Sequence, residues 1–151
     1  MKTGNFARRS IASSAVGFKV TDDDWLISIT DKKGKDLVTY LPFEHILFMK
    51  FDDTSDRDGN EISDTDALMI AEFIKSARQH HKNVWVNCHA GICRSGAIVT
   101  LLIELGWEDA KCFLSPGRIP NHLVYNKVRI HFPEVRHSWD PEPGATIVKA
   151  R

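Results

Sequence analysis

The chain lacks most of the features that would place it in a specialised class of protein. Three cysteines among 151 residues are too few, and odd in number, for a disulfide framework, so we expect a reduced, cytoplasmic protein. No apolar run approaches the roughly 20 residues of a membrane-spanning helix, and residues 1–18 lack the apolar segment of a secretory signal. Acidic and basic residues number 20 each, so the net charge gives no reason to expect a nucleic acid or a membrane as partner.

The composition that remains is typical of one globular domain. Apolar residues make up 42% of the chain, and its length allows a substantial core. We therefore expect a single domain over residues 1–151, with its core at about residues 20–132. Residues 1–17, which are small and polar, are expected to be partly loose, and so is the proline-containing tail at 138–151.

Segments with strand-like and helix-like patterns alternate along this core. The expected strands are 25–30, 36–40, 45–51 and 84–87, and the expected helices follow Ser63, cover about 95–105 and start at Pro120. Segment 45–51 is almost continuously apolar, as in a strand that is buried on both faces of a sheet. The alternation predicts an α/β fold with a central, mostly parallel sheet flanked by helices.

One segment carries most of the chemistry. Residues 84–96 read V-W-V-N-C-H-A-G-I-C-R-S-G and join a strand to a helix through a tight loop. Backbone N–H groups at a helix N-terminus attract an oxyanion, and Arg94 adds a planar fork that can grip two oxygens. The same field stabilises a thiolate on Cys88, which could attack phosphorus in line and form a cysteinyl-phosphate. Ser95 is placed to donate a hydrogen bond to the sulfur when it leaves.

The Cys-x5-Arg-Ser spacing between strand and helix resembles the active-site loop of the protein-tyrosine phosphatase superfamily, in its dual-specificity and compact bacterial-type branch. The order of the flanking segments and the sequence R-I-P-N at 118–121 are similar to that branch too, and the likeness covers about residues 20–132. It implies a phosphatase acting on phosphotyrosine, with phosphoserine and phosphothreonine as further candidates, in a phosphorylated protein or peptide and without metal or cofactor. It makes Cys88 the nucleophile and implies these phosphate-binding residues: His89, Ala90, Gly91, Ile92, Cys93 and Arg94.

Two positions depart from the pattern of that superfamily. Asn87 stands before the nucleophile, where the superfamily usually has a histidine that braces the loop, although an asparagine can still hydrogen-bond the backbone. The loop carries no lysine, whereas phosphoinositide phosphatases of the superfamily tend to have extra lysines there. A protein phosphomonoester is therefore expected rather than an inositol lipid.

The resemblance also implies a carboxylic acid that protonates the leaving group and then acts as base for the hydrolytic water. The acidic loop after segment 45–51 offers Asp52, Asp53, Asp56 and Asp58. Asp53 matches the superfamily's aspartate best, and Asp56 fits the usual spacing if the loop has no insertion. The sequence favours Asp53 and leaves the other three open.

Several alternatives remain open at this level. Cys93 either packs beneath the loop or traps an oxidised Cys88 as a reversible disulfide. The loop could belong to a module that binds phosphorylated partners with little turnover, or to a rhodanese-like sulfurtransferase, although the five-residue gap before Arg94 favours phosphate. The sequence does not predict the oligomeric state.

Overall fold

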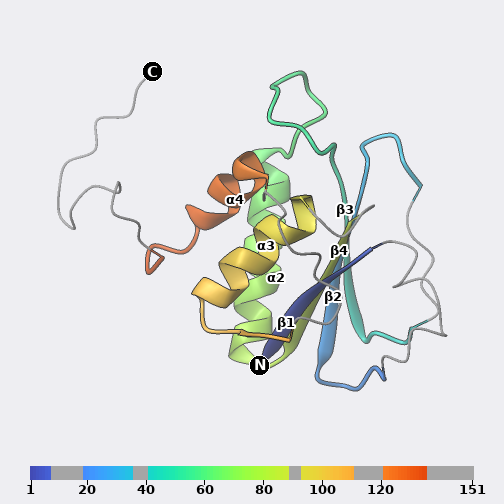
Figure 1. Cartoon of the computed structure of the whole chain (residues 1–151), viewed down its shortest axis with the longest axis vertical. Helices are drawn as coiled ribbons and strands as arrows, with labels where there is room; N and C mark the ends of the chain where they lie inside the picture. Colours follow the sequence, from blue (N-terminus) through green and yellow to red (C-terminus); the bar gives the residue numbers. More distant parts are fainter. Residues whose placement is uncertain (8–18, 36–40, 89–92, 111–120, 136–151) are drawn as a thin grey trace.

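The computed structural model describes residues 1–7, 19–35, 41–88, 93–110 and 121–135. Its strands are β1 (Lys2–Ala7), β2 (Asp24–Thr30), β3 (His45–Lys50), β4 (Asn83–Cys88) and β5 (Glu108–Asp109). Its helices are α2 (Asp64–Gln79), α3 (Cys93–Glu104) and α4 (His122–Arg129). The strands form one sheet in the order β3-β2-β4-β1-β5, every neighbouring pair is parallel, and the three helices lie together beside it (Figure 1). The predicted α/β fold with a parallel sheet is confirmed.

Helix α2 is fixed at its start by a reciprocal cap. The Asp66 N–H donates to Ser63 Oγ at 3.0 Å, and the Ser63 N–H donates to Asp66 Oδ2 at 3.1 Å. Its buried residues recur at helical spacing and are Ala67, Ile70, Ala71, Ile74 and Ala77. The predicted N-cap at Ser63 and the apolar face that follows it are both confirmed.

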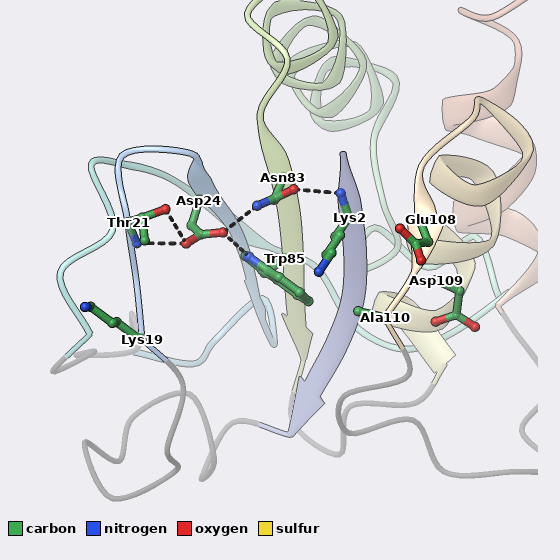
Figure 2. Close-up of a pocket in the computed structure, with 9 residues that line it drawn as sticks. All are labelled: Lys2, Lys19, Thr21, Asp24, Asn83, Trp85, Glu108, Asp109 and Ala110. Carbon is green, nitrogen blue, oxygen red and sulfur yellow. Dashed lines mark hydrogen bonds between the residues drawn. The ribbon is translucent and has the colours of Figure 1, made fainter.

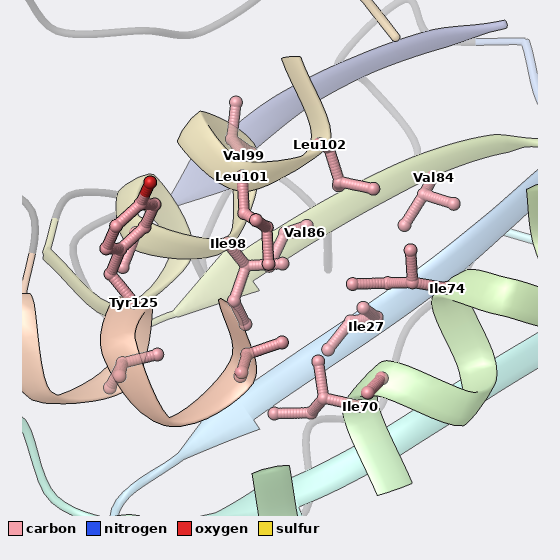
Figure 3. Close-up of a cluster of buried hydrophobic side chains, with 14 of the residues drawn as sticks. Ile27, Ile70, Ile74, Val84, Val86, Ile98, Val99, Leu101, Leu102 and Tyr125 are labelled. Carbon is pink, nitrogen blue, oxygen red and sulfur yellow. The ribbon is translucent and has the colours of Figure 1, made fainter. Parts of the chain in front are cut away.

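The main hydrophobic core lies between the sheet and the helices (Figure 3). Ile27 of β2 and Val86 of β4 are partners in the sheet register, and they share one cluster with Ile70, Ile74 and Ile98 from the helices. A smaller cluster is formed by Phe6, Leu26, Leu41, Phe43 and Trp85. Ile27 and Leu26 enter different clusters because successive side chains of a strand point to opposite faces.

The N-terminal strand corrects, for residues 1–7, the prediction that segment 1–17 is partly loose, and it corrects the prediction that the core begins near residue 20; residues 8–17 lie outside the described part of the chain. Strand β1 lies between β4 and β5, and Phe6 is fully buried with its ring centroid 5.7 Å from that of Trp85. Thr3 Oγ1 donates to the Val84 carbonyl at 2.7 Å, across 81 positions of sequence. The prediction was wrong because this strand is short and mostly polar, and its partners are remote in sequence.

Strand β3 corrects the prediction that segment 45–51 is buried on both faces. It is the outermost strand of the described sheet. Phe48 is 41% exposed, and Met49 is the only buried residue of the strand. Apolar composition alone does not separate an outer strand from a central one, which has more neighbours to cover its side chains. The strand expected at 36–40 and the tail at 138–151 lie outside the described residues.

A buried carboxylate joins the N-terminal ends of β2 and β4 (Figure 2). Asp24 Oδ1 accepts from Trp85 Nε1 at 2.8 Å and from Asn83 Nδ2 at 2.9 Å, and its Oδ2 accepts from the Thr21 N–H at 2.8 Å. Burial by itself raises the pKa of Asp24, but these hydrogen bonds to the charged form outweigh it, so that the pKa lies below its ordinary value of 3.8.

Phe6→Ala tests whether β1 belongs to the core. Removing a fully buried ring leaves a cavity and is expected to lower the free energy of unfolding by about 3–5 kcal/mol. Phe48→Ala is the matched control, because that ring is 41% exposed and its loss should cost less than about 1 kcal/mol. Chemical denaturation measures both values. Similar losses in the two variants would contradict the central position of β1.

Asp24 should make the free energy of unfolding depend on pH in the acid range. Because its pKa is lower in the folded than in the unfolded chain, its contribution is present above the unfolded-state pKa and is lost as the pH falls through the folded-state pKa. Asp24→Asn should therefore lose less stability on acidification than the wild type does. Denaturant titrations across the acid range measure the difference, with the exposed neighbour Asp22→Asn as control. Parallel pH profiles for Asp24→Asn and wild type would refute this.

Candidate functional site

The carboxyl ends of β2, β3 and β4 meet beside the first turn of α3, at the edge where parallel α/β sheets bind ligands. Strand β4 ends at Cys88 and helix α3 begins at Cys93. Cys88 is 2% exposed, and its Sγ lies 3.2 Å from Ser95 Oγ. The thiol predicted as nucleophile and the serine predicted to assist it are therefore in hydrogen-bonding contact.

Arg94 is buried at the same place although it carries a charge. It is 4% exposed, and its Nη1 donates to Asp31 Oδ1 at 2.8 Å and to the Phe51 carbonyl at 2.7 Å. These acceptors come directly after β2 and β3. Arg94 Nε is also buried and has no acceptor among the described residues. A buried donor without a partner is unfavourable, and an oxyanion in the site would satisfy it.

Only the two ends of the predicted phosphate-binding loop are described. The loop residues outside the described ranges are His89, Ala90, Gly91 and Ile92. Cys93 is partly buried, and its carbonyl accepts from the Asn121 N–H at 3.0 Å. Cys88 and Cys93 are not joined by a disulfide in this structure, so a disulfide between them stays a prediction for the oxidised protein.

The four candidate aspartates have different surroundings. Asp52 Oδ1 accepts from the Lys32 N–H at 2.9 Å and so connects the acidic loop to the segment after β2, whereas Asp58 Oδ1 accepts from the Asn60 N–H at 2.9 Å within a local turn. Asp53 is exposed, and its Oδ1 accepts from Asn121 Nδ2 at 2.9 Å. Asp56 is exposed as well. Of the four carboxylates, the one favoured from the sequence is thus the one bonded to a residue that also contacts the start of α3.

Asn121 joins the acidic loop to two helices. Its Oδ1 caps α4 by accepting from two N–H groups of the first turn, at 3.0 and 3.1 Å. Its Nδ2 donates to Asp53 Oδ1 and, at 3.3 Å, to the Thr54 carbonyl. Its backbone N–H donates to the carbonyl of Cys93. One side chain and its own backbone therefore hold the Asp53 segment near the helix that carries Arg94.

Two residues at the site were not predicted. Asn5 of β1 is buried, and its Nδ2 lies 3.5 Å from Ser95 Oγ. Asp31 is the ion-pair partner of Arg94. The position of Asp31 directly after a predicted strand was a usable signal, because the carboxyl ends of parallel strands share one edge. Asn5 offered no such signal, because β1 was not recognised as a strand.

Asn87, which directly precedes the predicted nucleophile, was expected to be able to hydrogen-bond the backbone. Its side chain is fully buried, and neither Oδ1 nor Nδ2 has a hydrogen-bond partner within the described part of the chain. No such hydrogen bond is observed among the described residues, and the loop at 89–92 lies outside them.

Other parts of the molecule do not add to this site. The pocket in Figure 2 lies at the N-terminal ends of the strands, around Asp24 and Trp85, and contains none of the predicted site residues. The described residues hold no group of three or more His, Cys, Asp or Glu side chains arranged to bind a metal ion.

Within the same ranges, no helix has both the length and the apolar character needed to cross a membrane.

Comparison with known proteins leaves the function to be argued from the site itself. Neither the protein-family models nor the curated proteins give a match to this sequence. Function depends on the chemistry of a site rather than on the fold that carries it. The site consists of the buried thiol, its serine neighbour and the buried guanidinium, whose Nε lacks an acceptor among the described residues.

Asn121→Asp and Asn121→Ala separate the two roles of this residue. Aspartate keeps the helix cap but loses the amide donor and places a second carboxylate beside Asp53, whereas alanine loses the cap as well. Alanine should therefore lower the free energy of unfolding by about 1 kcal/mol more than aspartate. Both changes should speed amide hydrogen exchange in the loop at 52–54, and Asn126→Asp, on the exposed face of α4, controls for the added charge. Exchange in both variants at the wild-type rate would rule out the tethering role.

Proposed function

We propose that this protein is a cysteine-dependent phosphatase that hydrolyses phosphomonoesters of proteins or peptides, with phosphotyrosine as the leading substrate class and phosphoserine and phosphothreonine as further candidates. One observation carries the proposal: the buried Cys88 thiol lies 3.2 Å from Ser95 Oγ in the first turn of α3, and the preceding residue, Arg94, has a buried guanidinium whose Nε has no acceptor among the described residues. A thiolate is a strong nucleophile, and a guanidinium edge matches two phosphate oxygens. The Cys-x5-Arg-Ser resemblance supports the same assignment.

The first chemical step transfers the phosphoryl group to sulfur. The Cys88 thiolate attacks phosphorus in line, and the bond from phosphorus to the substrate oxygen breaks. Arg94 and the first N–H groups of α3 bind the equatorial oxygens, over which the transition-state charge is spread. Asp53 gives a proton to the departing oxygen. The products are the free hydroxyl compound and a cysteinyl-phosphate.

The second step regenerates the thiolate. Water attacks the phosphorus, Asp53 accepts its proton, and the sulfur–phosphorus bond breaks to release inorganic phosphate. Ser95 Oγ, at 3.2 Å from Cys88 Sγ, donates a hydrogen bond to the departing sulfur and stabilises its negative charge. The serine therefore has its main effect on the hydrolysis of the intermediate.

A phosphate-binding module with little turnover is the second candidate. The observation that favours it is Asn87, whose buried amide has no hydrogen-bond partner among the described residues. A side chain that makes no hydrogen bonds braces the base of the loop less firmly than one that does. Such a loop would still bind phosphate through Arg94, but it would hold the thiolate less accurately for in-line attack.

Cys88→Ser tests the phosphatase assignment. Turnover of para-nitrophenyl phosphate should fall by a factor of about 10³ or more when the nucleophile is lost. Cys112→Ser, which changes the cysteine outside the motif in the same way, should keep wild-type turnover. Undiminished turnover in Cys88→Ser would refute the proposal. Tight phosphopeptide binding without hydrolysis would favour the binding module, and a persulfide formed on Cys88 from thiosulfate would indicate sulfur transfer.

The same assay with a phosphopeptide panel assigns the acid. Each of Asp52, Asp53, Asp56 and Asp58 is changed to Asn, and the loss of general acid catalysis should lower kcat by about 10²-fold or more in Asp53→Asn alone. A loss confined to Asp56→Asn would transfer the role to that residue. The panel also separates phosphotyrosine from phosphoserine and phosphothreonine as substrates.

A further inference from the structure

Asp31 stands at the edge of the site and has no part in the reaction described above. Its Oδ1 accepts from Arg94 Nη1 at 2.8 Å, and its side chain is 63% exposed while that of Arg94 is 5% exposed. The carboxylate thus lies at the protein surface and the guanidinium below it. The two residues are 63 positions apart in sequence, so the contact depends on the fold and not on local geometry.

The two acceptors around Arg94 determine which edge of the guanidinium remains for a ligand. Nη1 carries two hydrogens, and it donates to both Asp31 Oδ1 and the Phe51 carbonyl. The acceptors follow β2 and β3, which are neighbours in the sheet. Two bonds at one nitrogen fix the plane of a rigid, planar group. The edge formed by Nε and Nη2 is then the fork that can bind two oxygens of an oxyanion, and its Nε has no acceptor among the described residues.

We infer that Asp31 is a positioning residue that holds Arg94 with its Nε–Nη2 edge toward the bound phosphate. The inference rests on the proposed function, because it needs an oxyanion in the site. Asp31 does not itself touch the reacting atoms. It acts through Arg94, together with the Phe51 carbonyl, and this carbonyl cannot be removed by a side-chain substitution.

The charge of Asp31 works against its positioning role. A carboxylate near the site repels an anionic substrate, so removing it would raise the affinity for phosphate if charge were its only effect. That repulsion is weak, worth less than about fivefold, because the group is mostly exposed and screened by solvent. Loss of a correctly oriented, charge-assisted hydrogen-bond fork costs about tenfold or more. Orientation should therefore prevail, and the two effects have opposite signs.

Three variants of Asp31 separate position from charge. Asp31→Asn keeps an oxygen acceptor in place and removes the charge. Asp31→Glu keeps the charge and displaces the oxygen by one methylene, and Asp31→Ala removes both. Glu134→Gln is the matched control, because Glu134 also bonds an arginine Nη1 at 2.8 Å, that of Arg78, far from the site. Thermal unfolding of each variant shows whether it is folded.

Two measurements report on the orientation of Arg94. One is kcat and KM for para-nitrophenyl phosphate. The other is the ratio of the rates at which iodoacetate and iodoacetamide alkylate Cys88, since only the anionic reagent uses the guanidinium edge. A residue with a purely structural role would change the melting temperature and leave this ratio unaltered.

The expected result is a loss of about tenfold in kcat/KM and a lower alkylation ratio in Asp31→Ala and Asp31→Glu, with Asp31→Asn and Glu134→Gln at or above wild type. Higher values in both Asp31→Asn and Asp31→Ala, with Asp31→Glu unchanged, would show a charge effect only and overturn the inference. If the wild type is active and the alkylation ratio is the same in all three Asp31 variants as in the wild type, the inference is also overturned. A wild type without turnover and without preference for iodoacetate would instead refute the phosphatase itself, and the inference with it. If Asp31→Ala does not fold, the comparison of Asn with Glu decides.

Discussion

The burial of one guanidinium organises this end of the sheet. A charged side chain that is 4% exposed is tolerated only if polar groups surround it. Two such groups are the Asp31 carboxylate and the Phe51 carbonyl, and they come from the points where β2 and β3 end. The parallel register of these strands brings both acceptors to one place. These two hydrogen bonds make the burial of Arg94 tolerable, while its Nε still lacks an acceptor among the described residues.

A second set of polar contacts connects the thiol to the centre of the sheet. Ser95 Oγ lies between Cys88 Sγ and Asn5 Nδ2, at 3.2 and 3.5 Å. If the amide of Asn5 donates to the hydroxyl oxygen, the hydroxyl hydrogen is left to point at sulfur. Strand β1 thus contributes more than its buried Phe6, since Asn5 contacts the site residue Ser95 from the strand next to β4. Burying the polar side chains of this strand is unfavourable, and these hydrogen bonds, together with the one from Thr3 Oγ1 to the Val84 carbonyl, offset that desolvation.

The features that could be predicted from the sequence are those whose interacting residues are close together in the chain. The cap of α2 at Ser63 and Asp66 involves residues three positions apart, so the local pattern was sufficient to predict it. Strand β1 and the ion pair between Asp31 and Arg94 depend on partners 63 or more positions away, and neither has an apolar period that would reveal it. The motif Cys88–Arg94–Ser95 lies between these cases: its spacing is local, while the acceptors that bury Arg94 come from other strands.

The two halves of the proposed site are held by different kinds of contact. Cys88, Arg94 and Ser95 are buried and anchored to the sheet, so their geometry cannot change without disrupting the core. Asp53 is exposed and is held through Asn121, whose own position depends on the cap of α4 and on the carbonyl of Cys93. In the proposed mechanism, a rigid nucleophile with a separately tethered acid would allow the acid to be displaced without loss of phosphate binding. The proposed binding of a phosphorylated partner and the proposed turnover therefore depend on different contacts.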